Sequence, residues 1–426
     1  MEGELSALCV LGNHPGLERI QALLELLGHP EKNISYVHVA GTNGKGSSSM
    51  MIAAALSRAG YRCARFSSPH LHSYRERFLI DGKPISADLL YQLLQEVKAC
   101  ITGLRQQGIT HPTEFEVLTA IGFLFFQRAQ AEIAVLEVGM GGIYDSTNVI
   151  EPLVSLITSL DYDHTAFLGE SLEEIAANKA GIIKPEVPVI VGDLDASAQA
   201  VITARAEELA APLWNTREIM MEVLERKLSG QRLRFTTEAM SCHDLHLNLL
   251  GTYQIENLKL AVRALQILNE RGFAVSAEAF ASAMADLQMP GRMEVVRQQP
   301  LIILDAAHNP QGARVLSRSV QELLPDRKCV LLCGILDDKE LPGIMDPLAD
   351  ICRAVVVSRP EGNRSAHWQR VAEYVKVHWP TKPLLATENI AVALQQALAM
   401  LEPQDYLLIS GSFYLLSPVR SLLVTV

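Results

Sequence analysis

The most informative stretch of this sequence is His38–Ser49, which reads His-Val-Ala-Gly-Thr-Asn-Gly-Lys-Gly-Ser-Ser-Ser. Apolar residues that favour a strand lead into it, from Tyr36 to Ala40, and an alanine-rich helical pattern follows, from Met50 to Ala59. A strand, a glycine loop and a helix N-terminus in this order form a phosphate cradle, because backbone N–H groups and the helix dipole attract anions. The stretch therefore predicts a site for a nucleoside triphosphate.

Side-chain chemistry suggests separate roles within this loop. Lys45 can reach the outer phosphates, and the Ser47 hydroxyl can ligate Mg²⁺. The usual pattern places Ser or Thr directly after the lysine, whereas Gly46 intervenes here and the first glycine of the pattern is missing. A glycine-rich turn without a ligand is the alternative, although a lysine between two glycines then has little purpose. The predicted nucleotide-binding residues of the loop are Gly41, Thr42, Asn43, Gly44, Lys45, Gly46 and Ser47.

Length and composition indicate a globular protein of two or three domains. The chain has 426 residues, of which 49% are hydrophobic and 20% charged, as in soluble proteins. The net charge of -11 argues against nucleic acid or an anionic membrane as the main partner. Seven scattered cysteines without a Cys-x-x-Cys pair favour a reducing compartment and no structural zinc. With no secretory signal and no apolar run long enough for a membrane span, we expect a cytoplasmic protein.

Strand-like and helix-like segments alternate along nearly the whole chain. Continuous apolar strands between helices predict a mostly parallel sheet covered on both faces. Between Ile219 and Leu250 the pattern changes to alternating residues with a turn signal at Ser229-Gly230, which predicts β-hairpins. Met289-Pro290-Gly291-Arg292 then interrupts the chain before a second strand–helix alternation begins. We therefore predict two α/β domains, 1–290 and 291–426.

Candidate ligands for a metal ion follow several of the predicted strands. Glu137 ends the strand Ile133–Val138, at the edge where open α/β sheets bind ligands, and a carboxylate there suits Mg²⁺. Ser68 follows another strand and can add a hydroxyl or carbonyl oxygen. His164 follows Asp161 and Asp163 and can hold a second ion, although imidazole is softer than Mg²⁺ prefers. The alternatives are a solvent-facing glutamate and ordinary capping or loop residues.

Lys179 lies among small and apolar residues at the end of a predicted short helix. A desolvated lysine has a lowered pKa and becomes nucleophilic, so it can add CO₂ to form a carbamate. From the residues alone, a surface lysine at a helix C-terminus is the better interpretation.

The second domain offers its own candidates. Asp305 and His308 end a strand just before Pro310 and can contact a ribose, nucleotide or phosphate, unless they only shape the turn. Arg292 stands at the domain boundary and can reach a cleft. Asn257 opens a helix, where its amide can recognise a base or serve only as a cap.

Taken together, these motifs resemble the folylpolyglutamate synthase and dihydrofolate synthase family of the Mur ligase superfamily. Eight motifs match in order over nearly the whole chain: the loop from His38, Ser68-Pro-His-Leu, Glu137-Val-Gly, Asp163-His-Thr, Lys179-Ala-Gly-Ile, Gly251-Thr-Tyr-Gln, Pro290-Gly-Arg and Asp305-Ala-Ala-His-Asn-Pro. Ile143 departs from the pattern, because many relatives carry a charged residue at that position.

The resemblance implies an ATP-dependent ligase that adds L-glutamate to folate or dihydropteroate through an acyl phosphate. It implies an N-terminal P-loop ATPase domain, a Rossmann-like C-terminal domain, an active site between them, and a monomer. Lys45, Ser47 and Glu137 would hold phosphates and a first Mg²⁺. His164 would hold a second Mg²⁺ with Lys179 as its carbamate, and Arg292, Asp305 and His308 would close over the nucleotide. Catalysis would rest on Lys45, Lys179 and His308.

Two other functions stay open from the sequence. One is a cell-wall Mur ligase that uses a UDP-sugar substrate, although the Ser-Pro-His-Leu and His-Asn-Pro motifs speak against it. The other is a nucleotide-dependent switch without ligase chemistry, which would hydrolyse ATP regardless of any amino acid and would not require Asp305 or His308.

Overall fold

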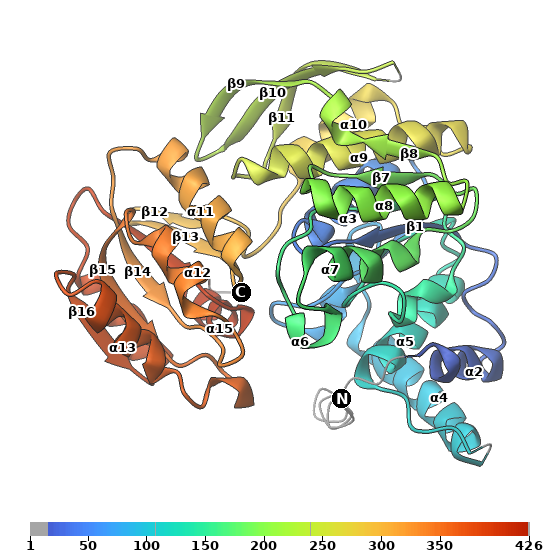
Figure 1. The fold of residues 1–426 in the computed structure, drawn as a ribbon, viewed down its shortest axis with the longest axis horizontal. Helices are drawn as coiled ribbons and strands as arrows, with labels where there is room; N and C mark the ends of the chain where they lie inside the picture. The colour runs from blue at the N-terminus through green and yellow to red at the C-terminus, as the bar shows by residue number, and fades with distance from the viewer. Residues whose placement is uncertain (1–15, 107, 239, 425–426) are drawn as a thin grey trace. The chain divides into compact units, whose positions relative to one another are not determined.

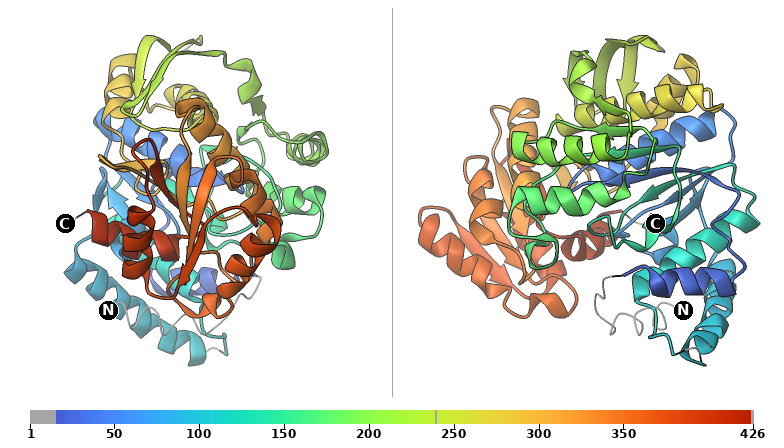
Figure 2. Two further views of the ribbon diagram at one scale, coloured as in Figure 1. Left: turned by 90° about the vertical axis from the view of Figure 1, so that its left-hand side faces the viewer. Right: turned by 45° about the vertical axis from the view of Figure 1, so that its right-hand side comes forward.

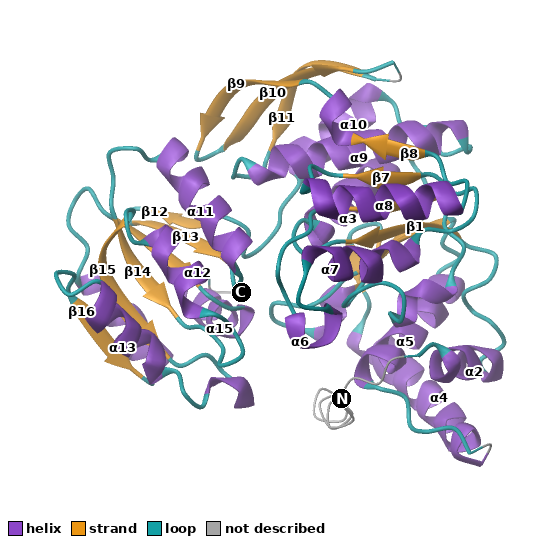
Figure 3. Cartoon of the chain, viewed as in Figure 1, coloured by secondary structure: helices purple, strands orange, loops and turns teal. Residues whose placement is uncertain are grey.

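The computed structural model describes residues 16–106, 108–238 and 240–424, which alternate between strands and helices (Figure 1, Figure 3). They form two compact units. Unit 1 takes its described residues from Met1–Glu222, Phe235–His243 and Glu256–Ala285, and unit 2 from Val223–Arg234, Asp244–Ile255 and Asp286–Val426. Two segments of the predicted range 1–290, Val223–Arg234 and Asp244–Ile255, thus belong to unit 2 and not to unit 1.

Unit 1 is built on an eight-stranded sheet in the order β4-β3-β2-β5-β1-β6-β7-β8. The strands from β2 to β8 in this order are parallel, and β3 and β4 extend one edge through antiparallel pairings. The bounds are β1 Ser35–Ala40, β2 Cys63–Phe66, β3 Phe78–Ile80, β4 Lys83–Pro84, β5 Ile133–Glu137, β6 Val154–Ile157, β7 Val189–Val191 and β8 Leu213–Asn215. The central β1 therefore delivers the glycine loop to the edge where the parallel strands end.

Helices cover both faces of this sheet (Figure 1). On one face Tyr36 packs beneath α2, α4 and α5, and Ala40 packs near α7 and α8. The other face carries α3, which is joined to α9 and α10 by hydrogen bonds from Ser48 Oγ to Asn257 O and from Arg58 to Ser282. The bounds are α2 Glu18–Leu26, α3 Lys45–Arg58, α4 Ala87–Gln106, α5 Glu114–Arg128, α6 Thr165–Leu168, α7 Leu172–Lys179, α8 Ala196–Glu208, α9 Tyr253–Glu270 and α10 Ala277–Asp286.

The predicted hairpins are confirmed as a three-stranded sheet, β11-β10-β9. Its strands are β9 Met221–Lys227, β10 Gly230–Thr236 and β11 Ser241–Leu247. Gly230 has a φ of +130°, which places a glycine at the start of β10 where the chain reverses.

Unit 2 contains a six-stranded sheet in the order β12-β13-β17-β14-β15-β16, with helices on both sides (Figure 2). The edge strand β12 is antiparallel to β13, and the other strands are parallel. The bounds are β12 Glu294–Gln298, β13 Leu301–Asp305, β14 Cys329–Cys333, β15 Cys352–Ser358, β16 Leu384–Thr387, β17 Tyr406–Ser410, α11 Pro310–Leu323, α12 Leu341–Met345, α13 Gln369–His378, α14 Ile390–Ala399 and α15 Phe413–Leu423.

The predicted fold class is confirmed: a mostly parallel P-loop unit with a small hairpin region and a Rossmann-like α/β unit. The core of unit 2 also takes in Leu250, with Leu228 and Tyr253 packed against it, from the exchanged segments. The six cysteines in the described part of the chain are free thiols, and Cys9 lies outside that part. None of the described helices combines the length and apolarity needed to span a membrane.

Candidate functional site

The glycine loop between β1 and α3 is shaped by two glycines that no other residue can replace without strain. Gly41 has a φ of +148°, and an added Cβ would lie 1.9 Å from Thr158 Oγ1. Gly44 has a φ of +88°, and its Cβ would lie 2.3 Å from Asn257 Oδ1. The backbone is therefore held in a left-handed, closely packed turn that brings the predicted Asn257 to the start of α3.

Lys45 folds back over this loop. Its Nζ donates to the carbonyl oxygens of Gly41 at 2.9 Å and Thr42 at 3.1 Å. Ser47 follows in the first turn of α3 and is buried. The ammonium group and the hydroxyl group are thus both presented at the helix N-terminus, where the dipole favours an anion.

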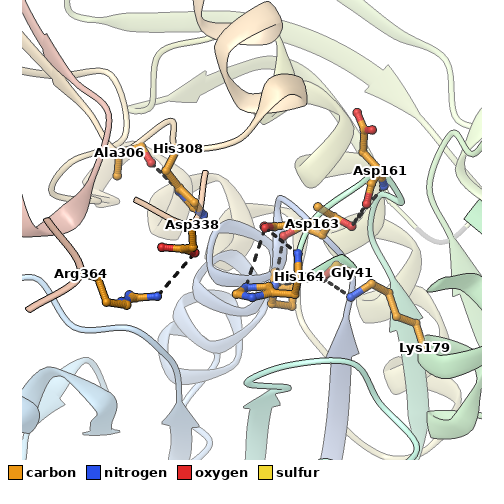
Figure 4. A network of polar contacts seen from close by, with 11 residues as sticks. Gly41, Asp161, Asp163, His164, Lys179, Ala306, His308, Asp338 and Arg364 are labelled. Atoms are coloured by element: carbon orange, nitrogen blue, oxygen red, sulfur yellow. Dashed lines mark hydrogen bonds and ion pairs between the residues drawn. The ribbon is translucent and has the colours of Figure 1, made fainter. Parts of the chain in front are cut away.

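Lys179 reaches the same loop from the end of α7. Its Nζ donates to Gly41 O at 3.1 Å, and the side chain points toward that carbonyl (Figure 4). Only 4% of Lys179 is exposed, so the interpretation as a surface lysine is wrong. Burial, together with the nearby charge of Lys45, lowers the pKa of Lys179 to about 7, while Asp163 and Asp145 act in the opposite direction. A substantial fraction of its amine is therefore unprotonated near neutral pH.

Glu137 ends β5 beside β1, opposite Val39 in the register, and is 4% exposed. The interpretation as a solvent-facing strand end is therefore wrong. Its carboxylate lies at the edge of the sheet from which the glycine loop departs. Arg65 on β2 faces the same region, and sequence reasoning did not identify it.

Asp145 holds the loop that follows Glu137, and it was also missed. Its carboxylate accepts from the N–H groups of Gly139 at 2.9 Å and Met140 at 3.0 Å, and from Thr147 N and Oγ1. Burial raises the pKa of Asp145, while these hydrogen bonds lower it. The run Asp145-Ser-Thr-Asn is a side-chain capping pattern that could have signalled this role.

The loop after β6 is tied to the glycine loop through Thr42. Thr42 Oγ1 donates to Asp161 O and accepts from Asp161 N, both at 3.1 Å. His164 has a φ of 50° and a side chain that is 39% exposed, with Nε2 3.9 Å from Asp163 Oδ1. Asp161, Asp163, His164 and Lys179 thus gather around Gly41 in the close-up view (Figure 4).

The chemistry of the donor set fits Mg²⁺ rather than a softer metal. Glu137 supplies a carboxylate, Ser47 a hydroxyl, and Ser68 lies two residues beyond the end of β2, beside β5. Among the described residues, no three His, Cys, Asp or Glu side chains cluster as a self-contained metal site. Magnesium sites in nucleotide-binding proteins commonly take one or two carboxylates and complete the shell with phosphate and water.

In unit 2, Asp305 ends β13 as a buried carboxylate. It accepts from Met293 N at 2.9 Å, Ala307 N at 2.8 Å and the Tyr253 hydroxyl at 3.2 Å. Burial raises the pKa of Asp305, while the charge of Arg292 is the largest influence that lowers it. Asp305 therefore fixes the turn after β13 from within.

Arg292 and His308 both lie against Phe413, the first residue of α15. The Arg292 guanidinium stands 4.9 Å from the ring centroid, and the His308 ring centre is 6.2 Å away. His308 Nδ1 lies 2.8 Å from Ala306 O, and since a carbonyl only accepts, Nδ1 carries the proton (Figure 4). The structure thus brings together Arg292, Asp305 and His308 within unit 2, and Phe413 joins them as a residue that the sequence did not reveal.

Two domain families match the chain. The Mur ligase middle domain matches residues 81–265, and the Mur ligase, glutamate ligase domain matches residues 291–413. The dihydrofolate synthase/folylpolyglutamate synthase of Bacillus subtilis is 34% identical over 415 residues, which cover 96% of this chain and 95% of the relative.

Solved structures agree in sequence and in fold. The Mycobacterium tuberculosis folylpolyglutamate synthase complexed with ADP and AMPPCP is 31% identical, with a TM-score of 0.90 over 96% of this chain and 95% of that one. The E. coli FolC in complex with DHPP and ADP is 29% identical, with a TM-score of 0.87 over 99% and 97%. The chain therefore belongs to the folylpolyglutamate synthase/dihydrofolate synthase family of the Mur ligases, which are ATP-dependent, amide-forming ligases.

Proposed function

We propose that this chain joins L-glutamate to the carboxyl group of a folate, and also of dihydropteroate, with ATP as the energy source. The observation that carries this proposal is the convergence of Lys45 and Lys179 on the Gly41 carbonyl, within a glycine loop at the N-terminus of α3. Family membership supplies the substrate class, since the Bacillus subtilis relative bears both activities in its name.

The chemistry explains why the ATP site needs these residues. A carboxylate is a poor acyl donor, so ATP first phosphorylates it, which releases ADP and leaves an acyl phosphate. The glutamate amine then attacks the acyl carbon, and phosphate departs from the tetrahedral intermediate. Lys45 exchanges its contacts with loop carbonyls for phosphate oxygens and offsets their charge. Holding the reacting groups in one orientation can supply on the order of 7–11 kcal/mol.

Two Mg²⁺ ions complete the proposed site. Ser47 and Glu137 would hold the first, with Ser68 as a further oxygen donor, and His164 and the modified Lys179 would hold the second. When bound there, Mg²⁺ would supply positive charge that offsets the phosphate oxygens during phosphoryl transfer.

We further propose that Lys179 carries a carbamate. Its unprotonated amine adds to the carbon of CO₂, and the proton released passes to solvent. The burial of Lys179, its pKa of about 7 and the adjacent Lys45 charge all support this step, because they favour a neutral amine first and an anion afterwards. Isotope-labelled bicarbonate should give a carbamate signal by carbon NMR in the wild type and none in K179M; equal spectra would contradict the assignment.

Residues of unit 2 are proposed to act on the nucleotide. Arg292 and His308 are presented on Phe413 and would contact phosphate and nucleotide, and Asp305 would contribute mainly by shaping their turn. Substitution of His308 by alanine should therefore lower the rate of ligation.

One assay tests the ligase function. Purified protein is mixed with ATP, MgCl₂, L-glutamate and either tetrahydrofolate or dihydropteroate, and ADP, phosphate and glutamylated product are measured. We expect the three products in equal amounts, and only when both glutamate and a pterin substrate are present. ADP release that does not depend on glutamate would instead indicate a nucleotide switch, and turnover with a UDP-sugar substrate alone would indicate a cell-wall ligase.

A further inference from the structure

Arg65 is a buried arginine in the middle of unit 1. It lies on β2, between Ala64 and Phe66, whose side chains belong to the core under α4 and α5. Because side chains alternate along a strand, Arg65 points to the opposite face of the sheet, which carries α3. Only 7% of Arg65 is exposed. A cation so deeply buried requires a compensating charge.

The hydrogen bonds of Arg65 do not satisfy its guanidinium group. Nη1 lies 3.4 Å from Gly46 O, in the first turn of α3, and Nε has no hydrogen-bond partner among the described residues. Burial lowers the pKa of Arg65, and the negative charge of Glu137 is the largest influence in the opposite direction, ahead of Cys63 and Glu76. Arg65 is thus held mainly by the field of a carboxylate.

The sheet register places Arg65 and Glu137 as diagonal neighbours. On the parallel strands β2 and β5, Phe66 stands opposite Leu136, and Arg65 stands opposite Val135. Phe66 and Leu136 share the core beneath α4 and α5, so Arg65 and Glu137 share the other face, two residues apart along the strands. Glu137 is 4% exposed, so both charges are withdrawn from water.

The other nearby carboxylate, Glu76, is already committed to backbone groups. It accepts from the N–H groups of Leu71 at 2.8 Å, His72 at 2.9 Å and Ser73 at 2.8 Å, and so caps the turn before β3. Glu137 therefore remains as the principal counter-charge of Arg65.

We propose that Arg65 is a built-in counter-cation of Glu137, which stabilises the buried carboxylate in metal-free protein and weakens the binding of Mg²⁺ beside it. The proposal rests on the place of Glu137 in the Mg²⁺ site. Arg65 and the ion share one negative charge and repel each other, so each is held less tightly when both are present. Arg65 is a positioning residue, because it acts on the metal through Glu137.

Replacing Arg65 with methionine keeps most of the apolar stem and removes the charge. In R65M, Glu137 loses the charge of Arg65, so the unfolding temperature in EDTA should fall by several degrees. Added Mg²⁺ then supplies positive charge beside Glu137 without repulsion from Arg65. We expect the MgCl₂ concentration that half-saturates the tightening of ADP binding to fall about tenfold.

The measurement is isothermal titration of ADP into the full chain, in EDTA and at stepped MgCl₂ concentrations, with parallel thermal unfolding. R65Q removes the charge but keeps an amide donor, and it should show the same shift with a smaller loss of stability. It carries the test if R65M does not fold.

R19M is the matched control. Arg19 Nε pairs with Glu116 Oε2 at 3.1 Å, with side chains 11% and 6% exposed, in the same unit. Breaking this equally buried pair should lower the unfolding temperature without moving the MgCl₂ midpoint.

An unchanged or raised MgCl₂ midpoint in R65M and R65Q would overturn the proposal. E137A separates its failure from that of the Mg²⁺ site. If E137A leaves the metal dependence of ADP binding intact, Glu137 is not a metal ligand. The proposed Mg²⁺ site at Glu137 and the proposed role of Arg65 are then both wrong. If E137A abolishes that dependence and the Arg65 variants do not change it, only the role of Arg65 is wrong.

Discussion

The loop Gly41–Gly46 of unit 1 and the turn Asp305–Asn309 of unit 2 both follow a strand within a parallel sheet, yet their charges are arranged in opposite ways. In unit 1, carbonyl oxygens of the loop face the cationic side chains of Lys45, Lys179 and Arg65. In unit 2, backbone N–H groups and a tyrosine hydroxyl surround the carboxylate of Asp305.

The loop of unit 1 is therefore suited to accept an anionic ligand, whereas the turn of unit 2 already surrounds an anion of the chain, the carboxylate of Asp305. The cations of unit 1 hold weak carbonyl acceptors, which phosphate oxygens can replace with a gain in charge pairing. The acceptor of unit 2 is already paired, so its turn is rigid and presents other side chains. Substitutions of the backbone and cations of the first loop should therefore affect nucleotide binding, and a substitution of Asp305 in the second should first affect stability.

The largest effect should come from Lys45, because no other side chain can bring its charge to the outer phosphates from the same helix turn. K45A is expected to lower ADP formation about a thousandfold, or about 4 kcal/mol. Steady-state assays measure the rate, and unfolding curves check the fold. K184A is the control, since Lys184 Nζ also donates to a backbone carbonyl, that of Asn148, outside the loop. Nearly full activity in K45A would show that the loop of unit 1 does not bind phosphate through Lys45.

Acid should weaken unit 1 through His38, which lies on β1 before the loop and is fully buried. Thr147 Oγ1 already donates to Asp145, so the 2.8 Å contact is donated by His38 Nε2, and Nδ1 is left without a partner among the described residues. Burial lowers the pKa of His38 to about 3.

The unfolded chain binds a proton at His38 below about pH 6.5, whereas the folded chain does so only near pH 3. The free energy of unfolding should therefore decrease as the pH is lowered through this window, by about 3 kcal/mol between pH 6.5 and pH 4. Urea unfolding of H38Q should show a shallower loss than the wild type over that range. Parallel profiles for the two proteins would argue against a neutral, buried imidazole.

G41A tests whether the backbone of the first loop is as constrained as its contacts indicate. The added methyl group meets Thr158 Oγ1 in a left-handed conformation, so the loop must shift, and ADP should bind about a hundredfold more weakly, or about 2.7 kcal/mol. G60A is the control, because Gly60 has a φ of +99° but open space around it, and it should cost stability alone. Calorimetric titration distinguishes the two, and wild-type affinity in G41A would show a deformable loop.

D305N tests whether the turn of unit 2 depends on the charge of its buried carboxylate. An amide in place of the carboxylate turns a donor toward Met293 N–H or the Tyr253 hydroxyl, which should cost about 2 kcal/mol of stability. D244N, at an exposed ion pair with Arg232, should leave the stability nearly unchanged. If D305N weakened ATP binding at unchanged stability, Asp305 would touch the nucleotide directly.

The smallest effect is expected at Phe413. F413L keeps an apolar side chain but removes the ring face under Arg292, a contact worth about 0.5–1 kcal/mol. The KM for ATP should rise a few-fold with little change in kcat. Y414L is matched to it, since Arg364 lies 5.5 Å from the Tyr414 ring one residue along, and it should leave the KM unchanged. The same KM for ATP in both variants would show that Phe413 does not position Arg292.

Much of this arrangement could be predicted from local sequence, because strands and glycine loops leave local signals. The strand predicted from Tyr36 to Ala40 lies within β1, Ser35–Ala40, and the strand predicted at Ile133–Val138 forms β5, Ile133–Glu137. The short strands β3, β4, β8 and β12 were not predicted, since segments of two to five residues at sheet edges carry little pattern.

The charge partners could not be predicted, because they depend on which strands become neighbours. Arg65 in Cys63-Ala-Arg-Phe has the pattern of a solvent-facing position on a half-buried strand. Only the pairing of β2 with β5, about seventy residues later in the chain, brings it to Glu137. Lys179 was interpreted from the residues as exposed for the same reason: nothing near it in sequence reveals that α7 ends against Gly41.

The exchange of segments between the units bears on how the chain can be cut and made. A fragment that stops at residue 290 would retain Leu228, Leu250 and Tyr253 but lose the core against which they pack. Those apolar side chains would be exposed to solvent, and the fragment would be prone to aggregate. During synthesis, the same residues leave the ribosome well before their packing partners on β13 and β17. They therefore stay unburied until the C-terminal sheet has been synthesised.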